Sequence, residues 1–435
     1  MRIYFEEAIT PLVQPHWQLS TVALPVLVSM DLTAVSGLSS QWIPSYFPSL
    51  RRLSLYRLSI DDTNLSLSQL TSLELNEIHF RARSLASLLD VLKTCTSLRH
   101  FVYGDTDDTP FKKSSVAAGY RVSLPRIRHF LIIATSANIS SLLAHVLLAK
   151  QTRILLKPKD FHPRQDENDH LPVLNAILPR DAAYWPAMKD VTHIMVWWEE
   201  GDGITVYADG KNTEFWESHP WRSLDYENLS ADGLSPAPAL FIEHINIHSS
   251  SFPSSIMGPL LAIVEELGDL FPASAKTFVL RGYAEEISTE TWAQTLARFP
   301  VIEHFELVAE VDAMCTFPLA LRPTSSGIPC PRLRELVLRY EAGAERDNSS
   351  WRMLDDLRVV LQERVGGGSR LQSLILQLDP PPEVEVFELF RQSTLLTATG
   401  RWPPDFEDIQ RELALLVGSL KISYRGPYDE WITVV

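Results

Sequence analysis

Cysteine is scarce in this chain of 435 residues, which contains only Cys95, Cys315 and Cys330. The three thiols show neither a paired arrangement nor a Cys-x-x-Cys motif, so the sequence offers no disulfide framework and no cysteine-based metal site. Small secreted proteins depend on such frameworks, whereas reducing compartments keep thiols free. The sequence therefore predicts an intracellular protein, either cytoplasmic or nuclear.

Long apolar runs are lacking as well. The most apolar early stretch, residues 19–35, contains Pro25 and Asp31 and is too short to cross a bilayer. The first ten residues, MRIYFEEAIT, contain two glutamates and no apolar core, so they do not resemble a secretory signal peptide. We expect a chain without a membrane span.

Positive charge is in deficit. Lysine and arginine total 39, against 54 aspartates and glutamates, which gives a formal net charge of −15 at pH 7. Contacts to phosphate require lysine and arginine, and an anionic membrane surface repels an acidic protein. The composition therefore argues against general nucleic-acid binding and against membrane-surface binding.

The motifs that mark common enzyme sites are absent from the sequence: G-x-S-x-G, H-E-x-x-H, Walker A and G-x-G-x-x-G. We interpret Gly366–Gly368 as the C-terminal cap of a helix, because no strand precedes it and no P-loop lysine follows it. The acidic pairs Asp61-Asp62 and Asp107-Asp108 fit solvated turns. We expect no catalytic residue, no cofactor and no metal ligand. An enzyme would instead require a deep pocket with strongly shifted pKa values.

What the sequence does contain is a recurring phrase. An apolar residue or cysteine, then Pro or Thr, then any residue, precedes the pattern apolar–x–x–apolar–x–apolar. The five clear copies are FPSLRRLSL (47–55), CTSLRHFVY (95–103), LPRIRHFLI (124–132), FPVIEHFEL (299–307) and CPRLRELVL (330–338). Six looser copies have the triplets Leu27/Met30/Leu32, Leu70/Leu73/Leu75, Val191/Ile194/Val196, Ile242/Ile245/Ile247, Ala275/Phe278/Leu280 and Leu371/Leu374/Leu376. Many neighbouring copies start about 20 to 38 residues apart, a period typical of repeat proteins.

Histidine marks the same position in many copies. The residue just before the second apolar position is His100, His129, His193, His244 or His304 in five of them, although the chain has only 12 histidines. This row fits a surface feature of the repeat, a set of partner contacts or a metal-binding strip. His244 and His248 would lie about 13 Å apart on one strand, which is too far for one metal ion. No cysteine or carboxylate recurs beside the row, so we expect no metal site.

Each copy predicts a strand followed by a helix. Apolar–x–apolar alternation gives a short strand with one buried face. Residues 84–93 (SLASLLDVLK) place leucines at i, i+3, i+4 and i+7, as in an amphipathic helix. Further helices are expected at 139–149, 256–267, 291–299, 351–365 and 405–417. One unit cannot bury its apolar faces alone, so the units should stack. The prediction is an α/β leucine-rich-repeat solenoid, an irregular horseshoe with a parallel concave sheet and outer helices.

The repeat pattern sets the expected domain boundaries. We predict an N-terminal cap over 1–24, the irregular solenoid over 25–420 and a C-terminal tail over 421–435. A loop and hairpin insertion is expected at about 157–235, since residues 157–180 are polar and rich in proline. Within it, Ile204 and Val206 alternate before an Asp209-Gly210 turn, which indicates a β-hairpin over 201–217.

The phrases FPSLRRLSL, LASLLDVLKTCTSLRHF and CPRLRELVL resemble the leucine-rich-repeat region of fungal, basidiomycete-type F-box proteins. The resemblance covers roughly residues 25–420. It implies a substrate receptor, whose repeats hold a target protein while an F-box module docks on the Skp-type adaptor of a cullin ubiquitin ligase. An F-box opens with Leu-Pro, an acidic residue and an Ile/Leu pair, but here Leu24-Pro25 is followed by VLVSM. No F-box is recognisable, so a free-standing protein-interaction scaffold is the alternative.

Candidate contact residues follow from the strand geometry. In a wall of parallel strands, the outward residues flank the last two apolar positions of each triplet. One tryptophan of the adjacent pair Trp197-Trp198 should point outward, where an exposed ring would be a binding anchor; packing in the core or against a loop is the alternative. We predict contacts to a protein target on the concave face by ten residues: His129, His193, Met195, Trp197, His244, Asn246, His304, Glu306, Glu335 and Arg339.

Overall fold

The chain forms two compact units in its computed structural model. The first comprises Met1–Glu167, Val173–Asp190 and Thr205–His248, and the second comprises Asn168–Pro172, Val191–Ile204 and Ser249–Val435. The structure describes residues 2–5, 26–39, 47–60, 67–80, 84–105, 111, 116–117, 119–159, 173–179, 185–199, 203–210, 239–245, 258–282, 284, 287–325, 327–340, 350–378, 406–425 and 431–434.

The first unit is built on a parallel sheet whose strands follow chain order, each paired with the next. The strands are β1 (Arg2–Phe5), β2 (Ser29–Ser39), β3 (Arg52–Ile60), β4 (Ser72–Asn76), β6 (His100–Gly104), β8 (His129–Ala134), β10 (Arg153–Pro158) and β13 (Leu240–Ile245). Strand β5 (His79–Phe80) pairs with the end of β3. Strands β7 (Val122–Leu124) and β9 (Val146–Leu148) form a separate pair. The remaining elements are α1 (Leu85–Thr94), α2 (Ser136–Ala144), α3 (Leu174–Ile177), the 3₁₀ helix η5 (Pro186–Asp190) and β12 (Gly203–Asp209).

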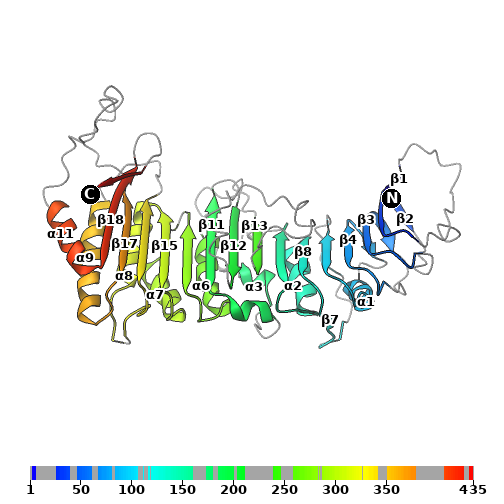
Figure 1. Cartoon of the computed structure of the whole chain (residues 1–435), viewed down its shortest axis with the longest axis horizontal. Helices are drawn as coiled ribbons and strands as arrows, with labels where there is room; N and C mark the ends of the chain where they lie inside the picture. Colours follow the sequence, from blue (N-terminus) through cyan, green and yellow to red (C-terminus); the bar gives the residue numbers. More distant parts are fainter. Residues whose placement is uncertain are drawn as a thin grey trace, which may run out of the picture. The chain divides into compact units, whose positions relative to one another are not determined.

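The second unit repeats this plan with longer helices. Its parallel strands are β11 (His193–Glu199), β14 (Thr277–Arg281), β15 (His304–Ala309), β16 (Glu335–Tyr340), β17 (Ser373–Leu378) and β18 (Ser419–Arg425), and β19 (Trp431–Val434) pairs antiparallel with β18. Its helices are α6 (Gly258–Leu270), α7 (Thr289–Arg298), α8 (Val311–Ala320), α9 (Ser350–Gly366) and α11 (Phe406–Leu416). Each helix contacts the next along the chain, and Figure 1 shows them gathered on one side of the strands.

The recurring phrase forms a turn followed by a strand. In all five clear copies the strand begins at the sixth residue of the phrase. The N–H of the fourth residue donates to the carbonyl of the first, as in Leu333 to Cys330 at 3.0 Å and Leu98 to Cys95 at 3.1 Å. The N–H groups of the fifth and sixth residues both donate to one carbonyl of the turn before the preceding strand. The phrase therefore recurs because each copy presents the same hydrogen-bonding edge to its neighbour.

Alternate residues of the strands are buried in the core. In β15, Phe305, Leu307 and Ala309 are buried, whereas the residues between them are half-buried. Phe305 stacks on Phe317 of α8, with ring centroids 4.3 Å apart, and meets Trp292 of α7 edge-on at 6.1 Å. The helices of the second unit thus cover this face, and we call the opposite face of the strands the outer face. The first unit follows the same alternation, with Phe101 and Phe130 in contact on its buried face.

Most of the expected elements are present, and one differs in part. The helix expected at 139–149 is α2, which ends at Ala144, and β9 follows it. Val146 and Leu148 are buried with Leu147 exposed between them, and β9 pairs with β7. Period-two burial and pairing therefore replace the last helical turn, because a β-branched residue and alternating apolar residues suit a strand edge.

The expected hairpin is seen only in its first strand. Strand β12 ends at Asp209, whose Oδ1 accepts a hydrogen bond of 2.6 Å from the Gly210 N–H. Residues 211–217, which would form the second strand, lie outside the described residues, as does most of the expected insertion at about 157–235. Among the described residues, no helix is long and apolar enough to cross a membrane. The boundaries of the predicted domains stay predictions.

Candidate protein-contact face

The second unit brings seven of the ten predicted contact residues into register on its strands. Strand register places Trp197, Arg281, Val308, Arg339 and Gln377 in one row, and Met195, Val279, Glu306, Val337 and Ile375 in the row before it. His193, Thr277, His304, Glu335 and Ser373 form the row at the strand starts. Residues from five strands therefore meet on one surface, although they are far apart in sequence.

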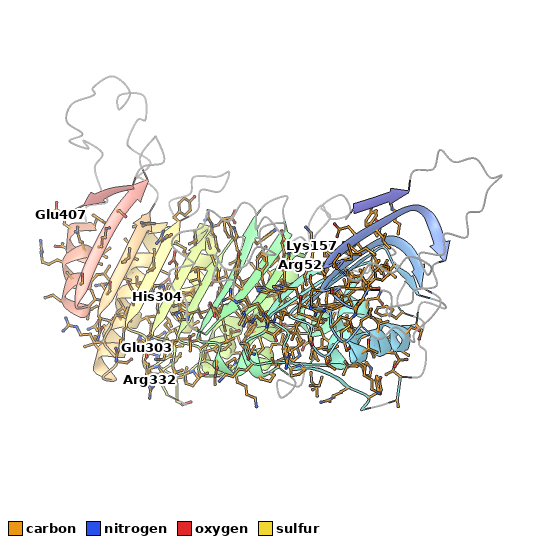
Figure 2. The ribbon with its side chains drawn as sticks, turned by 45° about the vertical axis from the view of Figure 1, so that its right-hand side comes forward. Arg52, Lys157, Glu303, His304, Arg332 and Glu407 are labelled. Atoms are coloured by element: carbon orange, nitrogen blue, oxygen red, sulfur yellow. The ribbon has the colours of Figure 1, made fainter. Side chains whose placement is uncertain are left out.

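Four of the predicted residues form a connected charge network on β15 and β16. His304 Nδ1 lies 2.9 Å from Glu335 Oε2, and its Nε2 lies 3.8 Å from Glu306 Oε2. Arg339 forms an ion pair with Glu306, with its Nε 3.0 Å from Glu306 Oε1. Figure 2 labels His304 at the start of β15, directly after Glu303. The imidazole is thus held between two carboxylates, one from its own strand and one from the next.

This network shifts the pKa values of its members. Burial alone would lower the pKa of His304, but its hydrogen bond to Glu335 and the nearby carboxylate of Glu306 outweigh this effect, and the pKa is raised above its usual 6.5. Burial alone would raise the pKa of Glu306, but the imidazole of His304 and the charges of Arg339 and Arg281 lower it. The arrangement therefore favours an ionised carboxylate between positive partners.

Arg281 extends the network to Trp197. Its guanidinium lies over the Trp197 ring, 4.9 Å from the ring centroid, at the distance of a cation–π contact. Sequence reasoning did not select Arg281. The signal was available, since Trp197, Arg281 and Arg339 all follow the third apolar residue of a triplet. We call Trp197, Arg281, His304, Glu306, Glu335 and Arg339 the outer-face cluster.

The side chains of the outer-face cluster are partly exposed to solvent. The side chains of Arg339 and Glu335 are 40% and 42% exposed, and those of His304 and Glu306 are 26% and 19% exposed. Trp197 is half-buried, whereas its neighbour Trp198 is 7% exposed, as the alternation predicted. Such side chains, fixed on strands and partly desolvated, suit recognition of a partner.

The predicted contact by Met195 is not matched by its exposure. This residue lies in the same row as Glu306 by strand register, but it is only 6% exposed, and its row neighbour Val337 is 2% exposed. Outward direction on a strand therefore does not ensure exposure. Met195 can support the surface, but it offers little area to a partner.

The remaining predicted residues are not part of the cluster. His193 starts β11 and its Nδ1 lies 2.8 Å from Thr192 Oγ1. His129 belongs to the first unit, where its ring stacks on His100 with centroids 4.8 Å apart. His244 is in β13, but its side chain lies outside what the structure describes, and so does the whole of Asn246. Among the described residues, no group of three or more His, Cys, Asp or Glu side chains could hold a metal ion.

Comparisons with known proteins add little to this picture. Neither a family model nor a curated protein matches the chain. Among solved structures, an internalin from Listeria monocytogenes aligns over 82% of this chain and 74% of its own, with 12% sequence identity and a TM-score of 0.26. A TM-score this low is below the level that indicates a shared fold.

Proposed function

We propose that this chain is a leucine-rich-repeat module that binds a protein through the outer face of its second unit. The observation that carries this proposal is the outer-face cluster, in which aromatic, cationic and anionic side chains from neighbouring strands form one continuous, partly exposed network. Tryptophan and arginine are the residue types that most often dominate binding energy at interfaces. The role assigned to these residues is contact, with no catalytic step.

The finer form of the proposal is a substrate receptor. The phrases shared with F-box proteins support a module that holds a substrate for a cullin ubiquitin ligase through a Skp-type adaptor. A free-standing interaction scaffold is the alternative, and it would use the same face. The two differ in one respect only, namely whether adaptor and cullin accompany the protein in cells.

Affinity purification of the tagged chain from its native cells, with quantitative mass spectrometry, tests both forms. The double variant Trp197→Ala/Arg339→Ala removes the aromatic anchor and the cation beside Glu306, so it should lose most of the specifically recovered partner. Arg358→Ala is the matched control, because Arg358 forms ion pairs with Glu412 and Asp355 on the helices. That variant should recover the partner as the wild type does.

The outcomes separate cleanly. Loss of a partner in the double variant alone, with an unchanged thermal transition, supports binding through the outer face. Equal recovery by all three proteins would contradict it. Co-recovery of a Skp-type adaptor and a cullin would support the receptor, and a reproducible partner without them would favour the scaffold.

A further inference from the structure

The strand starts of the first unit carry a row of basic side chains. Strand register aligns Arg52, Ser72, His100, His129 and Arg153 across five neighbouring strands. The residue before each of three of these strands is also an arginine. We call the whole set the basic edge, which consists of Arg51, Arg52, Arg99, His100, Arg128, His129 and Arg153.

A backbone ladder fixes the positions of these residues. The carbonyl of Thr71 accepts from the N–H groups of Arg99 and His100 at 2.8 and 3.0 Å. The carbonyl of Arg99 accepts from Arg128 and His129 at 2.8 and 3.0 Å, and that of Arg128 accepts from Arg153 at 2.7 Å. Because the ladder belongs to the repeat itself, the spacing between successive basic groups is set by rigid strands.

The cationic groups reach solvent. Arg51, Arg52, Arg99 and Arg128 are exposed, while His100, His129 and Arg153 are half-buried between them. Among the described residues, neither Arg99 nor Arg128 has an ion-pair partner. The acidic residue Glu74 lies on β4, two residues after Ser72 of the aligned row. Its Oε1 accepts a hydrogen bond of 2.6 Å from Asn76 Nδ2. The edge therefore carries an excess of positive charge in a chain that is acidic as a whole.

The pKa of His129, which lies within the basic edge, reflects this excess of positive charge. Burial lowers the pKa of His129, and the charges of His100, Arg153 and Arg128 lower it further, to about 4. Burial lowers the pKa of Arg153, and the carboxylate of Asp209 partly offsets this effect by favouring the charged form. His129 is therefore neutral at pH 7, and an anion bound beside it would favour its protonation.

The second unit shows that the repeat does not require this charge. At the equivalent positions it pairs opposite charges, with Lys276 3.6 Å from Glu303 and His304 2.9 Å from Glu335. The backbone ladder is the same, since Glu303 and His304 both donate to the Lys276 carbonyl. The basic edge is thus a property of the side chains chosen in the first unit, and not of the fold.

We propose that the basic edge binds an acidic, extended segment of a partner protein. Arginine forks match carboxylates in bidentate geometry. Four strand spacings of about 4.8 Å span roughly 19 Å, which corresponds to about six extended residues. A nucleic acid fits less well, because a polyanion that continues past this short row meets a chain of net charge −15.

This inference goes beyond the function proposed above and does not depend on it. The basic edge belongs to the first unit, whereas the outer-face cluster belongs to the second. The variant Trp197→Ala/Arg339→Ala should leave binding at the basic edge unchanged. Failure of one proposal is therefore distinguishable from failure of the other.

Fluorescence anisotropy with the full chain tests the inference. The probe is a fluorescein-labelled peptide of about ten residues in which glutamate alternates with serine, and the control peptide has glutamine for glutamate. We expect the acidic peptide to bind more tightly than the neutral one and to lose affinity as salt is raised. Arg99→Glu/Arg128→Glu should weaken its binding about tenfold or more, because two contacts become repulsive.

The second unit provides a control of equal charge. Arg332 and Arg334 are exposed and occupy the third and fifth positions of the phrase, as Arg126 and Arg128 do in the first unit (Figure 2 labels Arg332). Arg332→Glu/Arg334→Glu should change the affinity by less than about twofold. If either double variant fails to fold, the corresponding glutamine variants replace the pair, with the same order of effects expected.

Three results would overturn the inference. The first is equal binding of the acidic and the neutral peptide. The second is an equal loss in the two arginine pairs, which would mean general charge attraction. The third is tighter binding of a single-stranded oligonucleotide through Arg99 and Arg128, which would mean a nucleic-acid site.

Discussion

At the residue scale, two histidines at equivalent positions of the repeat have opposite electrostatic surroundings. His304 lies between the carboxylates of Glu306 and Glu335, and its pKa is raised. His129 is half-buried among cationic neighbours, and its pKa is lowered to about 4. The same residue type in the same repeat position thus has its pKa shifted in opposite directions, because the neighbouring strands supply different partners.

The two histidines should therefore change stability with pH in opposite directions. Protonated His304 stabilises the folded state fully below its unfolded pKa of about 6.5, and this contribution is lost as pH rises through the higher folded pKa. His304→Gln should consequently reduce the free energy of unfolding more at about pH 5.5 than at about pH 8.5. Urea denaturation at these two pH values measures the difference.

His129→Gln serves as the comparison for that experiment. In the window between its unfolded pKa of about 6.5 and its folded pKa of about 4, only the unfolded state takes up the proton. Wild-type His129 therefore costs stability as pH falls through this window. Replacement by glutamine should be more favourable at about pH 5.5 than at about pH 8.5, and parallel pH trends in both variants would contradict the assignment.

At the element scale, much of the fold could be predicted from the sequence, because the repeat is a local signal. The turn of each phrase closes within four residues, so FPVIEHFEL and CPRLRELVL predict the starts of β15 and β16 directly. The helices α1, α7, α9 and α11 follow from their own apolar periodicity. The end of α2 was missed because the pairing of β9 with β7 depends on residues more than twenty positions away.

The candidate site could be predicted only in part. The outward positions of β15 and β16 follow from alternation, so His304, Glu306, Glu335 and Arg339 were identified. The contact between Arg281 and Trp197 depends on which strand lies beside which, and β11 pairs with β14 across a long segment of chain. Met195 is nearly buried although alternation places it outward, because alternation gives the direction of a side chain and not its exposed fraction.

Arg364 connects three elements of the second unit. This arginine of α9 is 0% exposed, and it donates to the carbonyls of Leu321, Pro329 and Cys330 at 3.2, 2.7 and 3.0 Å. It also donates to Ser369 Oγ at 3.1 Å. One side chain thus ties the end of α8 and the turn before β16 to α9, and it satisfies backbone carbonyls that would otherwise be buried without donors.

Arg364→Met should therefore be strongly destabilising. It leaves several buried acceptors unsatisfied, and we expect a loss of about 3 kcal/mol or more in the free energy of unfolding, measured by urea denaturation. Arg322→Ala is the control, because Arg322 also joins α8 to α9 through Glu363 but does so in solvent. The control should have a small effect, and a similar loss in both variants would show that the buried bonds are not what holds these elements together.

At the scale of the whole molecule, the chain uses one structural plan in both units, and the two units differ in their outward side chains. Both units use the same turn, backbone ladder and buried alternation, yet the first carries an excess of cations at its strand starts and the second carries a balanced network with an aromatic anchor. The fold follows from the buried positions, and the proposed binding properties follow from the outward ones. Because the two sets alternate along each strand, surface chemistry can vary without disturbing the core.

Site-specific photocrosslinking in the native cells tests the central claim most directly. A benzoylphenylalanine placed at Trp197, or at Val308 in the same row, should crosslink to the same partner protein, identified by mass spectrometry. The same group at Arg358, on the helices, should give no such adduct. Common adducts from positions 197 and 308 alone are the predicted result. Adducts from position 358 only, or none from the outer face while a partner is recovered, would contradict binding through that face.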